Sequence, residues 1–325
     1  MLMRFLAATI ALAMVCIPAP RAEELRFFRI ATAATGGTYY PVGALIATAI
    51  SAPPGSRPCA QGGPCGVPGL IASAIASEGS VANVAAIQED RVESGLVQGD
   101  VAALAQMGAA PDLRAIAALY TEAIHVVTRR DAGIATIGDL RGKRVSVDMA
   151  GSGTMVDAGI ILAAAGLAPG DFTEARLNAS DAARALSRNE LDAFFFVGGY
   201  PAPAIAELAG QVEISLLPIP AELARQVAQD HPFLSESTIP PGTYQGQGEA
   251  VPTLSVAAIW ATSARQPDDL ILSITRALWS EPSARLLRTG RPMGRAIERS
   301  HALEGLGIPL HPGAAQFYRE IGMLD

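Results

Sequence analysis

The stretch Ala31–Gly43, ATAATGGTYYPVG, joins an apolar run to the start of a helix-like segment through two glycines. The preceding residues, Phe27–Ala33, have the composition of a β-strand, and Pro41 suits the first turn of a helix that begins near Tyr39. The first N–H groups of such a helix have no partner within it and can bind a small anion. The stretch therefore predicts a strand–loop–helix unit with a binding loop; the alternative is an ordinary turn in which Thr38 caps the helix.

This loop lacks the residues that nucleotide-binding loops require. A Walker A loop ends in Gly-Lys-Ser/Thr, and Thr35–Thr38 is not followed by a lysine. The dinucleotide fingerprint G-x-G-x-x-G is also absent from this turn. The loop therefore favours a carboxylate or another small anion over a nucleotide.

Two further loops repeat the pattern of strand, glycines, hydroxyl groups and helix. One is Asp148–Thr154, DMAGSGT, and the other is Val197–Pro201, VGGYP. Because the carboxyl ends of parallel strands meet at one edge of a sheet, we expect the three loops to line one cleft. Asn83 in GSVAN and Gln98 in LVQGD are further candidates for this cleft, each with the alternative of a cap or loop hydrogen bond.

Strand-like and helix-like runs alternate along the chain, which indicates an α/β fold with parallel-rich sheets covered by helices. The predicted strands are Phe27–Ala33, Gly69–Ala76, Val101–Gln106, Ala115–Leu119, Ile124–Arg129, Arg144–Asp148, Phe172–Leu177, Asp192–Val197 and Glu213–Pro218. The predicted helices are Tyr39–Ser51, Ser80–Glu89, Thr154–Ala165, Ser180–Arg188, Pro201–Ala209, Pro220–Gln229, Asp268–Trp279, Pro282–Leu287, Pro292–His301 and Ala314–Ile321.

Two long apolar runs, Tyr120–Thr128 and Thr253–Ala261, are candidates for strands that cross between two lobes. A middle block between two crossings, with both ends of the chain in the other lobe, describes a hinged, two-lobed protein. The predicted division is residues 23–119 plus 255–325 for lobe I and 120–254 for lobe II. A single three-layer domain is the alternative.

The first 22 residues have the pattern of a secretory signal peptide. Arg4 precedes an apolar run, Phe5–Ile17, and a small residue, Ala22, marks the expected cleavage site. The alternatives are an N-terminal membrane anchor, for which the run is short, and lipidation at Cys16. The sequence therefore predicts export to the periplasm.

Cys59 and Cys65, spaced C-A-Q-G-G-P-C, are the two cysteines outside this leader. The intervening glycines and proline can turn the chain back, so an oxidising compartment favours a disulfide. A metal site is the alternative, but zinc needs three or four ligands, and no histidine or third cysteine lies near these two cysteines in the sequence.

The composition excludes several classes of function. The formal net charge of −7 without basic clusters argues against a nucleic-acid partner. There is no Gly-x-Ser-x-Gly elbow, and the four histidines have no metal-ligand spacing. His231 and His311 precede prolines and are expected at the surface, whereas His125 is expected to be a hydrogen-bonded residue on a strand, not an acid–base partner of Glu122. We therefore expect no enzyme, no metal and no cofactor.

Five motifs in this order, TGGTYYPVG, GSVAN, LVQGD, DLRGKRVSVDMAGSGT and DAFFFVGGYP, resemble the TAXI family over residues 25–325. These proteins are the extracytoplasmic solute-binding subunits of tripartite ATP-independent periplasmic (TRAP) transporters. The resemblance implies a type II periplasmic-binding-protein fold, a monomer, TRAP membrane subunits as partners, and a small carboxylate such as glutamate or 2-oxoglutarate as the solute. The implied ligand-binding residues are Thr35, Gly36, Gly37, Thr38, Tyr39, Asn83, Gln98, Ser152, Gly153, Thr154, Gly198, Gly199 and Tyr200.

The loop between Cys59 and Cys65 departs from the family pattern and is expected to reshape the rim of the cleft. Two other functions use the same exported fold. One is a ligand-sensing module of a membrane receptor, and the other is an exported enzyme, which would need a nucleophile or an acid–base pair in the cleft.

Overall fold

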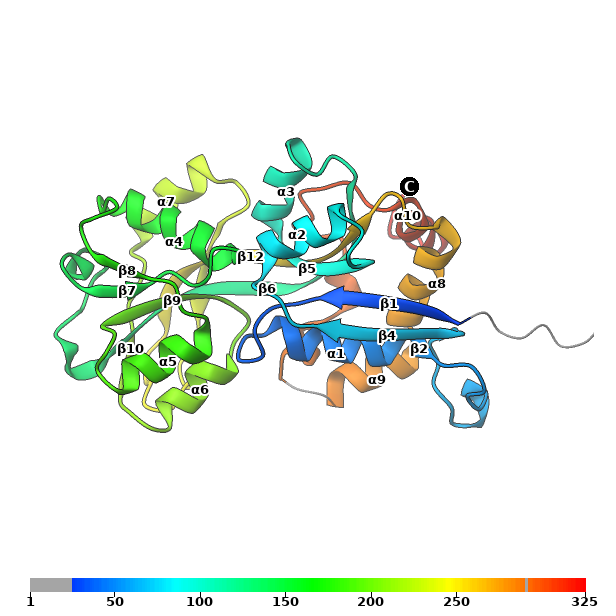
Figure 1. Cartoon of the computed structure of the whole chain (residues 1–325), viewed down its shortest axis with the longest axis horizontal. Coiled ribbons are helices and arrows are strands. Elements are labelled where there is room, and N and C mark those ends of the chain that lie inside the picture. Colours follow the sequence, from blue (N-terminus) through cyan, green and yellow to red (C-terminus); the bar gives the residue numbers. More distant parts are fainter. Residues whose placement is uncertain (1–24, 290–291) are drawn as a thin grey trace, which may run out of the picture.

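The computed structural model describes residues 25–289 and 292–325, and the predicted signal peptide lies outside them. Figure 1 shows two α/β lobes side by side, connected by the long strands β6 (Leu113–Arg129) and β12 (Val251–Ser263). Among the described residues, no helix combines the length and the apolar character that a bilayer span requires.

One mixed sheet runs through both lobes in the strand order β4-β1-β5-β12-β6-β9-β7-β8, with β10 paired to β6 and β11 to β12. Within each lobe the neighbouring strands pair in parallel, whereas β6 and β12 pair antiparallel with each other and with their neighbours. The remaining strands are β1 (Arg26–Ala31), β4 (Leu70–Ile75), β5 (Ser94–Gln98), β7 (Arg144–Ser146), β8 (Thr173–Ala175), β9 (Ala193–Gly198), β10 (Ile214–Leu216), β11 (Ser235–Ile239), and a short separate pair, β2 (Ser51–Ala52) and β3 (Val67–Pro68).

Helices cover both faces of this sheet. In Figure 1, α4 and α7 lie on one side of the sheet in one lobe and α5 and α6 on the other, while α2 and α3 lie opposite α1 and α9 in the second lobe. The helices are α1 (Tyr39–Ile50), α2 (Ser80–Gln88), α3 (Gly99–Met107), α4 (Gly153–Ala164), α5 (Ala179–Ser187), α6 (Pro203–Ala209), α7 (Ala221–Asp230), α8 (Asp268–Leu278), α9 (Glu281–Thr289) and α10 (Pro312–Glu320). Short 3-10 turns are η1 (Cys59–Gln61), η2 (Arg130–Ala132), η3 (Ile137–Leu140), η4 (Pro292–Ala296) and η5 (Arg299–His301).

The buried apolar side chains form separate cores in the two lobes. On β6 the core of one lobe ends at Tyr120 and that of the other begins at Ala123. On β12 the change falls between Val256 and Ala258. We use lobe I for residues 25–120 plus 258–325 and lobe II for residues 123–256. Two strands without a shared core between their ends form a connection that can bend as a hinge.

Several sequence-based assignments of secondary structure were wrong. The predicted strand Val101–Gln106 lies within α3, and the strand before it is β5. A short apolar run does not distinguish a buried strand from a buried helix, and its three alanines favour a helix. The runs Ala115–Leu119 and Ile124–Arg129 belong to the single strand β6. The predicted helix Pro292–His301 consists of the two turns η4 and η5.

His311 is buried, contrary to the expectation of a surface loop. Its Nδ1 accepts a hydrogen bond from Gly313 N at 3.2 Å and caps α10, and its Nε2 lies 3.1 Å from the carbonyl oxygen of Gln266. His125 has the expected structural role, since its ring nitrogens lie 3.0 Å from Ala123 O and 3.0 Å from the hydroxyl of Tyr244. Burial lowers the pKa of His125 to about 4, so this ring is neutral at pH 7.

Candidate functional site

A small cavity of about 40 Å³ lies between the lobes, at the carboxyl ends of strands from both of them. Of the predicted binding residues, it is lined by Gly37, Thr38, Tyr39, Gln98, Ser152, Gly153 and Thr154. It is also lined by residues that were not predicted, namely Ala33, Ala34, Glu78, Gly79, Ser80, Asp148, Asn178, Ala179, Phe196 and Val197. The structure therefore brings the first two predicted loops together around one space, and Val197 at the start of the third loop also lines it.

Four helices begin at this cavity, two from each lobe. The first residues of α1, α2, α4 and α5 are Tyr39, Ser80, Gly153 and Ala179, and all four line the cavity. Each helix start carries the positive end of the helix dipole. Some of the first N–H groups already have partners, since Ser152 Oγ accepts from Thr154 N, Asn178 Oδ1 from Ser180 N and Asp181 N, and Gly151 O from Ala82 N. None of the described residues that line the cavity is Lys, Arg or His. Positive potential in the cavity therefore comes from backbone dipoles and not from charged side chains.

Direct hydrogen bonds between the lobes show that they are closed. Ala82 N of lobe I donates to Gly151 O of lobe II at 3.0 Å, and Ala204 N of lobe II donates to Gly36 O at 3.2 Å. A further bond runs from Gly199 N to the hydroxyl of Thr38 at 3.3 Å. Backbone groups of the predicted loops thus serve the lobe interface itself.

The side chains of Thr38 and Tyr39 connect the cavity to the hinge. The hydroxyl of Thr38 makes no cap bond to α1; it accepts the bond from Gly199 N and a 3.4 Å bond from the hydroxyl of Tyr120. The hydroxyl of Tyr39 donates to Glu122 Oε2 at 2.8 Å, and both side chains are buried. Burial, and secondly the charge of Glu122, raise the pKa of Tyr39 well above its usual value.

The lobe II loop is organised by Asp148. Its Oδ1 accepts from Met149 N at 2.8 Å and its Oδ2 accepts from the hydroxyl of Ser152 at 3.1 Å. The Ser152 oxygen also accepts from Thr154 N at 3.0 Å and so caps α4, while the hydroxyl of Thr154 accepts from Val197 N at 3.0 Å. These bonds fix the loop and leave the α4 N-terminus facing the cavity. Burial raises the pKa of Asp148 to about 6.

Three buried acids lie beside the cavity wall: Asp100 on α3, Glu122 on β6 and Asp157 on α4. Gln98 Nε2 donates to Asp157 Oδ2 at 3.1 Å and so joins lobe I to lobe II. Burial raises the pKa of Glu122 to about 8, and burial together with the neighbouring acid Asp100 raises that of Asp157 well above its usual value. Among the described residues, no group of three or more His, Cys, Asp or Glu side chains is arranged to hold a metal ion.

The other predicted residues lie outside the cavity wall. Asn83 is fully buried, and its amide donates to Thr32 O at 2.6 Å and Leu96 O at 2.7 Å and accepts from the hydroxyl of Ser77 at 2.6 Å. These bonds tie α2 to the sheet of lobe I, so Asn83 is a structural residue in the closed arrangement.

Thr35 is exposed, whereas Gly36 and Gly199 contribute to the lobe interface through their backbones. Gly198 ends β9 against Phe196, which makes the actual contact with the cavity. Tyr200 lines a second, larger cavity of about 410 Å³ beside the hinge. The third predicted loop therefore supports the interface and the hinge side of the cleft.

Some of the missed residues had signals in the sequence. Asp100 and Asp148 stand inside the motifs LVQGD and DMAGSGT, in which the prediction names the amide, glycine and hydroxyl residues and not the acids. Glu78 directly precedes the GSVAN motif. Asp157 is an interior helix residue and had no local signal.

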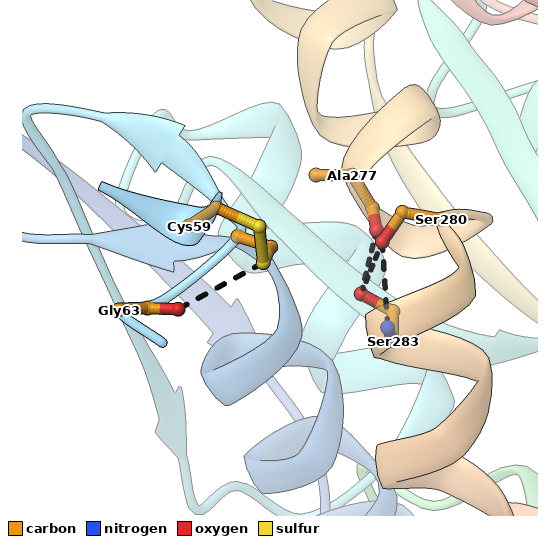
Figure 2. The surroundings of a disulfide bond; sticks show 6 residues. Cys59, Gly63, Ala277, Ser280 and Ser283 are labelled. Carbon is orange, nitrogen blue, oxygen red and sulfur yellow. Dashed lines mark hydrogen bonds between the residues drawn. A yellow bond between two sulfur atoms is a disulfide. The ribbon is translucent and has the colours of Figure 1, made fainter. Parts of the chain in front are cut away.

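The predicted disulfide is confirmed. Cys59 and Cys65 are bonded, with their Cα atoms 4.8 Å apart, in an exposed loop between β2 and β3 (Figure 2). This loop projects from lobe I at the end far from lobe II (Figure 1), and none of residues 53–66 lines the cavity. The expectation that it reshapes the rim of the cleft was wrong, because the chain crosses the whole of β4 before it reaches the cavity.

Comparison with known proteins identifies the fold. A model of the NMT1-like family matches residues 30–322. PhnD1 from Prochlorococcus marinus MIT 9301, solved in complex with methylphosphonate, has a TM-score of 0.52 at 10% identity, over 92% of this chain and 99% of that one. A protein of Bordetella bronchiseptica RB50 has a TM-score of 0.52 at 15% identity, over 90% of this chain and 82% of that one. The periplasmic aliphatic sulphonate binding protein SsuA of Escherichia coli has a TM-score of 0.42 at 16% identity, over 90% and 82%. Likeness at these identities concerns the fold, and the predicted two-lobed α/β class is confirmed.

Proposed function

Because the chain belongs to the NMT1-like family and closes two lobes around a small cavity, we propose that it is an extracytoplasmic solute-binding protein. The single observation that carries this proposal is the convergence of four helix N-termini, two from each lobe, on the interlobe cavity. An anion that satisfies N–H groups of both lobes does so only when the lobes close, so its binding energy favours the closed state. The exposed disulfide supports an oxidising compartment such as the periplasm.

We propose a compact carboxylate of low charge as the solute. Helix N-termini stabilise a single negative charge well, whereas a dianion is usually paired with Arg or Lys, and the described cavity wall contains neither. Two carboxyl groups, those of Glu78 and Asp148, also belong to the wall. An amino acid fits this pattern, with its carboxylate at the helix starts and its ammonium group towards these acids.

The size of the cavity constrains the solute further. About 40 Å³ exceeds the space that one water molecule needs but is far below the volume of a drug-sized site. Glutamate and 2-oxoglutarate, the solutes suggested by the TAXI resemblance, therefore require lobes that rest slightly farther apart. Methylphosphonate, which PhnD1 holds, is the competing class of small anion.

A thermal-shift screen of the mature chain, residues 23–325, tests the solute class. The probes are acetate, pyruvate, glycine, L-glutamate, 2-oxoglutarate, methylphosphonate and methanesulfonate, with choline as a cationic control. A true ligand at one hundred times its Kd stabilises the folded state by about 2.7 kcal/mol. A carboxylate or an amino acid is expected to raise Tm. Stabilisation by choline alone, or by none of the acids, would contradict the proposed solute class.

The proposed partner is a membrane permease, and the TAXI-like motifs favour the TRAP type. An ABC importer and a receptor that uses the same fold for sensing are the alternatives. Uptake of the radiolabelled solute by cells separates these possibilities. TRAP transport should stop when the ion gradient is dissipated and persist when ATP is depleted, an ABC importer should show the reverse, and a receptor module should leave uptake unchanged when its gene is deleted.

A further inference from the structure

The three buried acids beside the cavity come from both lobes. Asp100 lies in the first turn of α3 in lobe I, Glu122 lies on β6 at the hinge, and Asp157 lies on α4 in lobe II. Their residues are 5%, 1% and 0% exposed. This acid cluster is therefore assembled and dry only when the lobes are closed.

Few hydrogen-bond donors compensate these acids. Glu122 receives one bond, from the hydroxyl of Tyr39 at 2.8 Å, and Asp157 receives one, from Gln98 Nε2 at 3.1 Å. Both side-chain oxygens of Asp100, Oε1 of Glu122 and Oδ1 of Asp157 have no partner among the described residues. Burial of an ionised carboxylate with so few donors is strongly unfavourable.

The other titratable groups that face the cluster do not neutralise it. His231, which follows α7, acts on Asp100 at longer range, and the hydroxyl groups of Tyr39 and Tyr120 face Glu122. No lysine or arginine within the described residues makes an ion pair or a hydrogen bond with the three acids. Protons are the remaining means of removing the negative charge.

We propose that the acid cluster of Asp100, Glu122 and Asp157 binds protons as the lobes close, so that closure is favoured at acidic pH and weakened as pH rises. In the closed state the charge of Asp100, from lobe I, opposes ionisation of Asp157, from lobe II. Opening separates them and lets water reach all three acids. The inference depends on the two-lobed fold and its hinge and not on the identity of the solute.

The direction of the pKa shifts agrees with this mechanism. Burial raises the pKa of Glu122 to about 8 in the closed state, and those of Asp157 and Asp100 are raised as well, first by burial. Acids in contact with water have pKa values near 4. At pH values between the pKa of the exposed acid and that of the buried acid, closure takes up protons. In this range the ratio of closed to open molecules falls about tenfold per pH unit for each proton taken up.

Asp148 is a further buried acid of the cleft that titrates in this range. Its pKa is raised to about 6, but its hydrogen bonds to Met149 N and Ser152 lie entirely within lobe II. Above pH 7 the carboxyl group of Asp148 is largely ionised and adds little to the pH dependence of lobe closure. The effect of the acid cluster is therefore best measured between pH 7 and 9.

The test measures lobe closure directly in the mature chain without any solute. Spin labels on cysteines introduced at Met107 of α3 and Glu222 of α7, both exposed, report the distance between the lobes. The native cysteines are joined in a disulfide and do not take up label. The ratio of closed to open molecules is obtained from distance distributions at each pH, by pulsed electron paramagnetic resonance.

We expect the logarithm of this ratio to fall as pH rises from 7 to 9, by up to one per pH unit for each acid that is still protonated in the closed state. Asp157→Asn and Glu122→Gln, each an uncharged amide of similar shape, should each reduce this slope by up to one. Glu249→Gln, which removes an exposed acid of lobe II, should leave the slope unchanged.

A closed-to-open ratio that is independent of pH would overturn the proposal, as would amide variants that keep the full slope. If one amide variant does not fold, as judged by circular dichroism, the other and the wild-type profile still decide. Because no solute is present, failure of this test leaves the proposed solute-binding function standing. Failure of the solute screen likewise leaves this test intact.

Discussion

A single methyl group at Gly153 is expected to hold the lobes apart without harming the fold. Gly153 is the first residue of α4 and faces lobe I. A Cβ atom built there would lie 2.5 Å from Cδ of Gln98 and 3.0 Å from the hydroxyl oxygen of Ser80. Both distances are shorter than a van der Waals contact, so in Gly153→Ala the side chain of Gln98 must leave its place before the lobes can close.

The cost of this displacement follows from the bond that Gln98 makes. Its Nε2 donates to Asp157 Oδ2 at 3.1 Å, and loss of that donor leaves a buried acceptor without a partner. Such a loss costs about 1–3 kcal/mol. The closed-to-open ratio is therefore expected to fall by about 5- to 150-fold. The open form does not carry this cost.

The control for this variant is Gly159→Ala in the same helix. A Cβ atom at Gly159 meets no atom within 4 Å, so the change adds helix propensity without a clash. Urea unfolding should show Gly159→Ala more stable than wild type by about 1 kcal/mol. Interlobe distances at pH 6 should show that Gly159→Ala remains closed and that Gly153→Ala opens. Equal closed fractions in the two variants would refute the tight interlobe packing on which the account of closure depends.

Three further predictions concern stability. Glu122 has a pKa raised to about 8 in the folded chain, so its stabilising effect is complete below pH 4 and is lost as pH rises through 8. Glu122→Gln should therefore raise Tm relative to wild type at pH 9 but not at pH 5. Equal Tm differences at the two pH values would count against a buried neutral acid. Replacement of both Cys59 and Cys65 by serine should lower the free energy of unfolding by about 2 kcal/mol in urea titrations while interlobe distances stay as in wild type, and a change in those distances would contradict the remote position of the loop. Asp192 accepts bonds from Arg144 N at 2.7 Å and from its guanidinium at 2.7 and 3.0 Å, and these bonds lower the pKa of Asp192. Asp192→Asn should cost about 1 kcal/mol at pH 7, and a cost that does not diminish as the acid is titrated at acidic pH would exclude the ion pair as its cause.

The sequence predicted those parts of the site whose residues lie close together in one short segment of the chain. Thr38 and Tyr39 follow a strand and open a helix, and Ser152 and Gly153 do the same, so local pattern placed both loops at the carboxyl ends of strands. The first loop follows β1 in lobe I and the second follows β7 in lobe II, and these strands are not neighbours in the sheet. Their meeting at one cavity depends on closure of the lobes, which the local pattern does not contain.

The parts that escaped prediction depend on contacts between distant segments. Asp100 was hidden because its helix was read as a strand, which placed the acid in a loop before it. Asp157 lies inside α4, where nothing local distinguishes a buried acid from an exposed one. Asn83 was predicted to bind solute, but its amide bonds to Thr32 O and Leu96 O, and the sequence does not reveal those partners. Burial and pairing of polar groups are properties of the closed fold.

The measurement that tests the central claim most directly is small-angle X-ray scattering of the mature chain at pH 8, with and without the acid selected by the thermal-shift screen. At this pH the free protein is expected to populate the open form, and a saturating carboxylate or amino acid should reduce the radius of gyration as the lobes close over the helix N-termini. Gly153→Ala should show a smaller reduction at the same solute concentration. A radius of gyration that is unchanged by a solute that raises Tm would contradict capture by lobe closure.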